Sequence, residues 1–231
     1  MTRFFALAAA AALFLTACDS TETETVDLSV QTATDVEADL ATRIGPMGPT
    51  GSGRYTLYSL RDGEVVLSSN EADATIRQRD SASTKWDIGF NATTIILNGG
   101  ASGPGVSTGV LVSAAFENVT DALNENYVYR RDGEASCPSG AALAICTGSS
   151  NGWYSYAPFS SNPADGGYIL PTAGRTLLVR LADGSGYAKV RFVSYYKGNP
   201  VASAITATSE SRYYTFDYVV NTEGSTFVEA N

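Results

Sequence analysis

The sequence contains no histidine, and this absence excludes several classes of function. Among 231 residues there are 0 His, 2 Met and 3 Cys. Without imidazole there is no Ser-His-Asp or Cys-His nucleophile system, no His-ligated zinc or two-His-one-carboxylate iron site, and no histidine general base. Most familiar hydrolases are therefore excluded, and we expect a protein that is not an enzyme.

Positive charge is also scarce. The 15 Lys and Arg residues face 24 Asp and Glu residues, which gives a net charge of −9. Proteins that bind nucleic acid need a basic surface for the phosphate backbone, so nucleic acid is not an expected partner. Hydrophobic residues make up 44% of the chain and charged residues only 17%, which is the balance of a folded protein rather than a disordered one.

No apolar run is long enough for a lasting transmembrane helix, which needs about 20 residues. The run from Ala6 to Leu15 follows Arg3 and ends at small residues, so residues 1–17 are predicted to be a secretory signal peptide. The sequence Leu15-Thr16-Ala17-Cys18 resembles a bacterial lipobox, which implies cleavage before Cys18 and attachment of palmitate-type acyl chains to it. The alternative is an ordinary secretory signal in which Cys18 is incidental.

The segment behind Cys18 is strongly acidic. Residues 19–42 contain seven Asp and Glu residues and no Lys or Arg, whereas residues 43–231 carry 14 basic and 17 acidic residues. An acidic stretch rich in Ser and Thr favours a solvated tether. The chain is therefore divided into a signal peptide at 1–17, a lipidated cysteine with an acidic tether at 18–42 that can include a first short strand, and one domain at 43–231.

Two cysteines remain for the domain. Cys137 and Cys146 enclose a short Pro- and Gly-containing loop, and an exported protein meets an oxidising compartment. This spacing favours a disulfide between them, with free thiols as the alternative. It is neither Cys-x-x-Cys nor accompanied by other soft ligands, so a redox or metal role is not expected.

Period-two alternation bounded by turn residues recurs from residue 55 onward and predicts antiparallel strands. Hairpins are predicted at residues 55–67, around Asp62-Gly63, and at residues 175–196, around Asp183-Gly184. Further strands are predicted at 85–90, 93–97 and 212–220. Helical signal is weak, with a turn or two at residues 113–123 and 139–145 and none elsewhere. The expected fold is all-β, a single antiparallel sheet or sandwich-like domain with long loops and little helix.

In the strand at 85–90, alternation places Trp86, Ile88 and Phe90 on one face and Asp87 with Gly89 on the other. This pattern predicts a strand that is buried on one side only. Asp87 is therefore interpreted as a polar residue of the solvent face rather than as a catalytic carboxylate.

Two motifs have ordinary structural explanations. The run Asn98 to Gly105 is rich in glycine, but no Lys-Ser/Thr and no helix pattern follow it, so a structural loop is expected rather than a phosphate site. Asp132 and Asp183 occur in Asp-Gly turns without a twelve-residue ligand loop, which argues against calcium. No metal site is predicted.

The middle of the domain is rich in aromatic residues. They include Tyr127, Tyr129, Trp153, Tyr154 and Tyr156, which lie in or beside the loop-rich part of the chain. Such rings could line a pocket for a flat, apolar ligand, and they are the candidate ligand-binding residues. Packing in the core is the alternative for the same rings.

Seven segments, in this order along the chain, resemble the HmuY-type haem-binding lipoproteins of Bacteroidota. These segments are 86–90, 98–105, 153–154, 168–171, 186–190, 194–197 and 214–216. The resemblance implies an all-β fold, a lipid anchor in the outer membrane with display on the cell surface, and capture of haem for a TonB-dependent receptor or another outer-membrane protein.

The chain departs from this family in its iron ligands. The resemblance implies two axial side chains, His or Met, but the chain has no His and keeps only Met47 after removal of the signal peptide. If iron is bound, a tyrosinate from Tyr127, Tyr129, Tyr154 or Tyr156 is the reasonable substitute. The ligand expected from the resemblance is haem or another tetrapyrrole; the alternative is a surface lipoprotein that docks on an outer-membrane partner and binds no haem.

Overall fold

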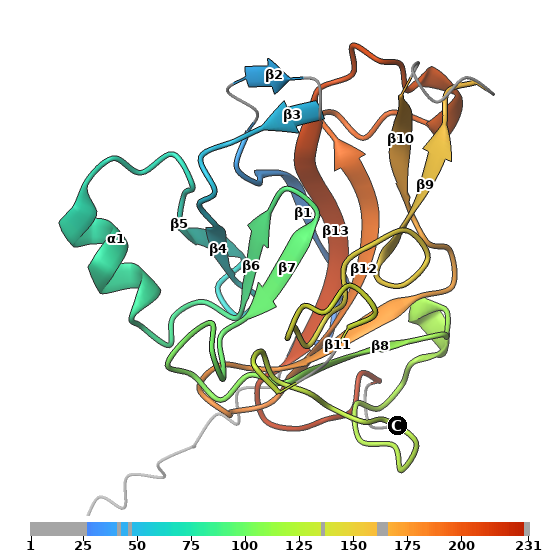
Figure 1. Cartoon of the computed structure of the whole chain (residues 1–231). Helices are drawn as coiled ribbons and strands as arrows, with labels where there is room; N and C mark the ends of the chain where they lie inside the picture. Colours follow the sequence, from blue (N-terminus) through green and yellow to red (C-terminus); the bar gives the residue numbers. More distant parts are fainter. Residues whose placement is uncertain (1–26, 41–42, 46–47, 135–136, 161–165, 229–231) are drawn as a thin grey trace, which may run out of the picture.

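The computed structural model describes residues 27–40, 43–45, 48–134, 137–160 and 166–228. Its largest sheet is antiparallel and has the strand order β1-β13-β12-β11-β8 (Figure 1). The strands of this sheet are β1 (Gln31–Glu37), β8 (Gly109–Val112), β11 (Thr176–Arg180), β12 (Tyr187–Tyr196) and β13 (Ser211–Asn221). The edge strand β1 falls within the range 18–42 that the sequence assigned to the tether.

A second antiparallel sheet has the strand order β5-β4-β6-β7. Its strands are β4 (Thr56–Ser59), β5 (Glu64–Leu67), β6 (Ile88–Asn91) and β7 (Thr94–Leu97). Two hairpins complete the strands, β2 (Arg43–Gly45) with β3 (Gly48–Thr50) and β9 (Tyr154–Pro158) with β10 (Gly167–Pro171). The prediction of an all-β fold with antiparallel strands and little helix is confirmed.

The main core lies between the five-stranded and the four-stranded sheets. Phe90 from β6 packs at 4.5 Å from Tyr214 and at 5.6 Å from Phe216, both on β13, measured between ring centroids. The predicted alternation of β13 is confirmed, because Tyr214, Phe216, Tyr218 and Val220 all join this core. Each fully buried side chain of this size stabilises the fold by about 1.5–3 kcal/mol.

The prediction of a half-buried strand at 85–90 is wrong. Ile88 and Phe90 face the main core, but Trp86 packs on the opposite face of the sheet, with Leu57 and Ile96. Both faces are therefore buried. Trp86 precedes the first residue of β6, so the alternation of the strand does not extend to it.

Asp87 is an interior residue rather than one of the solvent face. It is fully buried, and its carboxylate accepts hydrogen bonds from the backbone N–H groups of Leu60 (2.9 Å) and Ala182 (2.8 Å). Arg61 Nε lies 3.5 Å from the same carboxylate. Burial raises the pKa of Asp87, while the two N–H donors and the arginine oppose this shift.

Helical structure is limited to three short elements in the described residues: α1 (Ala74–Ser81), the 3₁₀ turn η1 (Phe116–Asn118) and the 3₁₀ turn η3 (Ala202–Ala204). The predicted turn within 113–123 is confirmed as η1, whereas described residues 139–145 contain no helix. Helix α1 was missed, because its sequence is almost entirely polar and has no apolar stripe. It begins at Asp73, whose carboxylate accepts hydrogen bonds from the N–H groups of Thr75 and Ile76. In the part of the chain that the structure describes, no helix is both long and apolar enough to cross a membrane.

Candidate functional site

The β9–β10 hairpin forms one wall of a cavity against β12. In Figure 1 the hairpin projects beside the ends of β12 and β13, away from the four-stranded sheet. The N–H group of Ile169 on β10 donates a hydrogen bond to the Tyr196 hydroxyl at the end of β12, at 3.0 Å. The last strand of the hairpin is thereby fixed to the large sheet.

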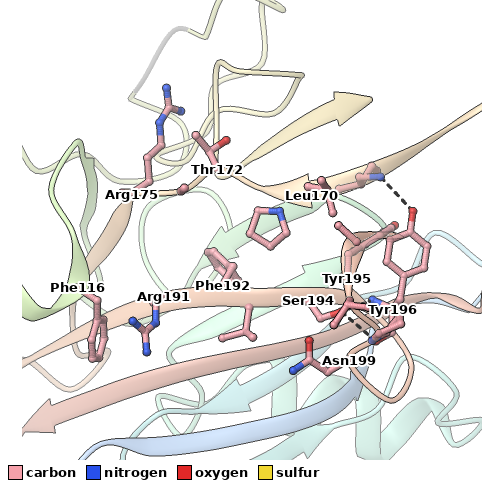
Figure 2. A pocket seen from close by; sticks show the side chains of 18 of the residues that line it. Phe116, Leu170, Thr172, Arg175, Arg191, Phe192, Ser194, Tyr195, Tyr196 and Asn199 are labelled. Atoms are coloured by element: carbon pink, nitrogen blue, oxygen red, sulfur yellow. Dashed lines mark hydrogen bonds between the residues drawn. The ribbon is translucent and has the colours of Figure 1, made fainter. Parts of the chain in front are cut away.

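The cavity has a volume of about 480 Å³. Figure 2 shows its wall on β12, where Phe192, Ser194 and Tyr195 lie below Leu170 and Thr172 of the hairpin side. Its ends are formed by η1 on one side and by residues 199–205, which include η3, on the other. The volume lies in the range of about 300–1,000 Å³ that is typical of small-molecule sites.

The wall of the cavity carries one polar group that lacks a partner. The Thr172 hydroxyl is buried and has no hydrogen-bond partner in the described residues. A buried polar group without a partner is costly, so this hydroxyl lowers the stability of the hairpin side of the cavity.

The two cations of the wall are already engaged. Arg191 Nη2 lies 2.7 Å from the Asp217 carboxylate, Arg191 Nη1 pairs with Glu117, and the guanidinium stacks 4.9 Å from the Phe116 ring. Arg175 donates hydrogen bonds to the backbone carbonyls of Gly152 and Ser150. Carboxylates therefore neutralise Arg191, whereas Arg175 is held by neutral carbonyl groups.

The tyrosines of the cavity are not suited to bind iron. Burial raises the pKa of Tyr195, which is 4% exposed. Burial also raises the pKa of Tyr196, against the lowering effect of the Ile169 N–H bond. Both phenols are therefore protonated at neutral pH, and a haem iron would need the phenolate. The described lining contains neither His nor Met, so these residues do not fit an axial ligand set.

Two of the predicted ligand-binding residues lie behind the cavity. Trp153 is 2% exposed, donates its indole N–H to the Thr93 carbonyl at 3.0 Å, and packs at 5.0 Å from Phe192 and 5.8 Å from Tyr195. Tyr154 is buried against the Trp153 ring at 5.0 Å. These rings support the wall formed by Phe192 and Tyr195.

The other predicted aromatic residues lie apart from these two. Tyr156 is 50% exposed on β9. Tyr127 and Tyr129 belong to a separate apolar cluster on the opposite face of the large sheet, where Tyr129 donates its hydroxyl to the Ala122 carbonyl. The structure therefore does not bring the five candidate residues into one pocket.

The predicted pairing of the two cysteines in the domain is confirmed. Cys137 and Cys146 form a disulfide, and the loop between them is held by the buried carboxylate of Asp132, which accepts the N–H group of Ala144 at 2.8 Å. Among the described residues no group of His, Cys, Asp and Glu is arranged to hold a metal ion. Cys18 and Met47 lie outside the described residues.

The residues that form the cavity had a signal in the sequence. Residues 168–171 and 194–197 are two of the segments that carry the resemblance to a known family, and they supply facing walls. Their composition did not distinguish them from ordinary strands, and the contact of β10 with β12 arises only in the tertiary structure.

Comparison with protein families gives a match over most of the chain. Residues 53–218 match the family described as HmuY protein. Among curated proteins, none matches the chain.

Proposed function

The chain belongs to the HmuY family, and from this premise we propose that it is an exported, lipid-anchored binding protein that captures haem or another tetrapyrrole. The observation that carries the proposal is the cavity of about 480 Å³ between the β9–β10 hairpin and β12. The role is binding rather than catalysis.

The lining of the cavity supports a flat, largely apolar ligand. Phe192 offers an aromatic surface, and Leu170 and Ile205 offer aliphatic ones. Aromatic and aliphatic walls with few polar groups are typical of sites for such ligands.

We infer that binding does not depend on a bond between the protein and the iron. The chain has no His, and burial keeps Tyr195 and Tyr196 in the protonated form. Contacts with the macrocycle would then supply the affinity, so haem and the metal-free ring should bind alike. This mode sets the chain apart from the His or Met ligation that the family resemblance implies.

The anchor and the location belong to the same proposal. Lipidation of Cys18 would hold the domain at the outer membrane, on the cell surface, within reach of a TonB-dependent receptor. Cys18→Ala is expected to release the protein from membranes or to block its processing. Unchanged partitioning into detergent would contradict lipidation.

The second candidate is a surface lipoprotein that docks on an outer-membrane partner and binds no haem. The neutralisation of Arg191 and the lack of an iron ligand in the described lining of the cavity favour it over an iron-dependent site.

The two candidates are separated by titrating the full chain with hemin and with protoporphyrin IX, followed by absorbance. Saturable binding of both, with affinities within about tenfold, supports capture without ligation. Val193 lines the cavity, so Val193→Trp should weaken both titrations by about 100-fold or more. Val30 is 58% exposed and lies outside the cavity, so Val30→Trp is the matched control.

Three results would decide against this mode. Binding of hemin but not protoporphyrin IX would indicate iron ligation, and its loss in Tyr156→Phe or Tyr154→Phe would assign the ligand. Equal effects of Val193→Trp and Val30→Trp would show that the ligand does not bind in this cavity. Absence of saturable binding for both compounds would support the second candidate, a surface lipoprotein that docks on an outer-membrane partner.

A further inference from the structure

A second hollow, the α1 pocket, lies between helix α1 and the outer face of the four-stranded sheet. Its volume is about 370 Å³. The floor consists of four buried apolar side chains: Leu57, Leu67, Trp86 and Ile96. These residues are separate from the main core and from the cavity at β12.

The sequence of α1 explains why a hollow remains above this floor. Alternate residues of β4 and β7 point outward, so Leu57 and Ile96 form an apolar outer face. The helix above contributes Ile76 to that cluster, but elsewhere it faces the pocket with Ala74, Gln78 and Ser81. Small and polar side chains cannot fill the space above the floor.

The mouth of the α1 pocket carries two arginines and, in its described lining, no carboxylate. Arg54 Nη1 donates to the Glu71 carbonyl at 3.1 Å, and Arg77 Nη1 donates to the same carbonyl at 2.9 Å. Arg77 Nη1 also donates to the Ala72 carbonyl at 2.8 Å. The shared acceptor holds the two guanidinium groups close together.

Neighbouring carboxylates are bound to other groups. The Glu71 carboxylate accepts the N–H group of Asp73 at 2.8 Å, the Asp73 carboxylate caps α1, and Asp80 pairs with Arg79 at 2.8 Å. Neither Arg54 nor Arg77 forms an ion pair within the described part of the chain. Among the described residues, two cations thus stand above an apolar floor without an ion pair; the Asp73 carboxylate is the acid that Arg77 acts on electrostatically.

We propose that the α1 pocket binds a single-chain amphiphile with one anionic end, such as a medium-chain fatty acid. Its carboxylate would lie between Arg54 and Arg77, which can form charge-assisted hydrogen bonds with it. Its chain would lie on Trp86. At about 30 Å³ for each water-sized group, the volume accommodates a chain of about twelve carbons. This site is independent of the tetrapyrrole cavity.

The two tryptophans of the chain allow a direct test, because only Trp86 lies at the α1 pocket and Trp153 lies in the main core. The full chain is titrated with 12-bromododecanoate, whose bromine quenches tryptophan fluorescence on contact. Saturable quenching below the micelle concentration is expected, and it should persist in Trp153→Phe. The uncharged 12-bromododecanol should bind at least about tenfold more weakly.

Substitutions at the mouth of the α1 pocket assign the binding site. Arg54→Gln with Arg77→Gln should weaken quenching by 12-bromododecanoate by about tenfold or more, whereas Arg79→Gln, on the same helix but paired with Asp80, should not change it. Ala74 is exposed at the start of α1, so Ala74→Phe fills the mouth without disturbing the core and should abolish quenching.

Any of four results overturns the proposal. These are equal binding of the acid and the alcohol, equal effects of the Arg54/Arg77 and Arg79 substitutions, full quenching in Ala74→Phe, and quenching that is absent or begins only when the probe forms micelles. None of these results bears on the proposal of tetrapyrrole binding, since Phe192 and Tyr195 lie at the other site.

Discussion

The cavity at β12 and the α1 pocket differ in how their arginines are neutralised. At β12, Glu117 and Asp217 neutralise Arg191, while Arg175 donates to the backbone carbonyls of Gly152 and Ser150. At α1 the arginines Arg54 and Arg77 contact only backbone carbonyls among the interactions described above. The first hollow therefore favours a flat ligand through shape and apolar contact, while the second favours a ligand with a negative end.

The two hollows also differ in what supports them. The cavity at β12 is supported by the packed rings of the main core. One side of the α1 pocket is instead formed by a short polar helix whose first turn is capped by Asp73. Substitutions in one support should leave the other hollow intact, because the two sites share no lining residue.

The largest effect is expected for Trp153→Ala. Removal of a fully packed tryptophan lowers the free energy of unfolding by about 3–5 kcal/mol. Phe192 and Tyr195 lose the ring behind them, so tetrapyrrole binding should fall, whereas quenching of Trp86 by 12-bromododecanoate should remain. Chemical denaturation and the two titrations measure this. A parallel loss at both hollows would show that they are not independent.

A smaller effect is expected for Tyr196→Phe. The change leaves the Ile169 N–H group without its acceptor, which lowers the free energy of unfolding by about 1–2 kcal/mol. The hairpin should then exchange its amide hydrogens faster, and tetrapyrrole affinity should fall several-fold. Hydrogen exchange at β10 measures this directly. If exchange there is unchanged, the hairpin is held by other contacts.

Asp73→Ala tests whether the N-cap of α1 maintains the α1 pocket. Loss of the N-cap lowers the free energy of unfolding and frays the first turn of α1. Fatty-acid affinity should fall a few-fold, with no change in tetrapyrrole affinity. Asp73→Asn keeps an N-cap acceptor and is the control. Equal behaviour of the Ala and Asn variants would contradict a role for the cap.

The smallest effect concerns acid stability. Burial raises the pKa of Asp39, but hydrogen bonds from Ser52 and Gly53, with the nearby Arg212, bring it below the ordinary 3.8. Since the folded state binds this proton more weakly than the unfolded state, the stabilisation is complete above the ordinary pKa and is lost as the pH falls through the folded one.

The measurement compares Asp39→Asn with the parent chain by denaturation from about pH 7 downward. The variant should be less stable by up to about 1 kcal/mol near neutrality, with the gap closing in acid. Because Gly53 precedes Arg54, the change acts on the segment that carries one arginine of the α1 pocket. A gap that stays constant with pH would exclude the carboxylate charge as its cause.

The strands were predictable because the alternation in residues such as Tyr214, Phe216 and Tyr218 is local and periodic. The disulfide was predictable because the loop between Cys137 and Cys146 is short. Helix α1 was not, since its only clear signal is the cap at Asp73 and Ile76 is its one large apolar residue. The interior position of Asp87 was missed because alternation cannot tell which polar residue meets N–H donors from distant segments.

The five candidate aromatic residues illustrate the limit for the site. A run such as Trp153 to Tyr156 indicates that some of its rings are buried. The sequence does not determine whether these rings line a cavity or pack behind its wall. Here the cavity wall comes from β10 and β12, which belong to different sheets and meet only in the folded protein. The resemblance segments at 168–171 and 194–197 were the better guide.

The carboxylate of Asp87 has a consequence for how the protein folds. It joins two backbone amides, one 27 residues before it and one 95 residues after it in the chain. Neither hairpin alone can provide both donors, so full satisfaction of this acid requires that the two sheets have docked. Long-range closure of this kind slows folding but makes it cooperative. The amides of Leu60 and Ala182 should therefore become protected in one step, as a reporter of the moment when the halves of the sandwich meet.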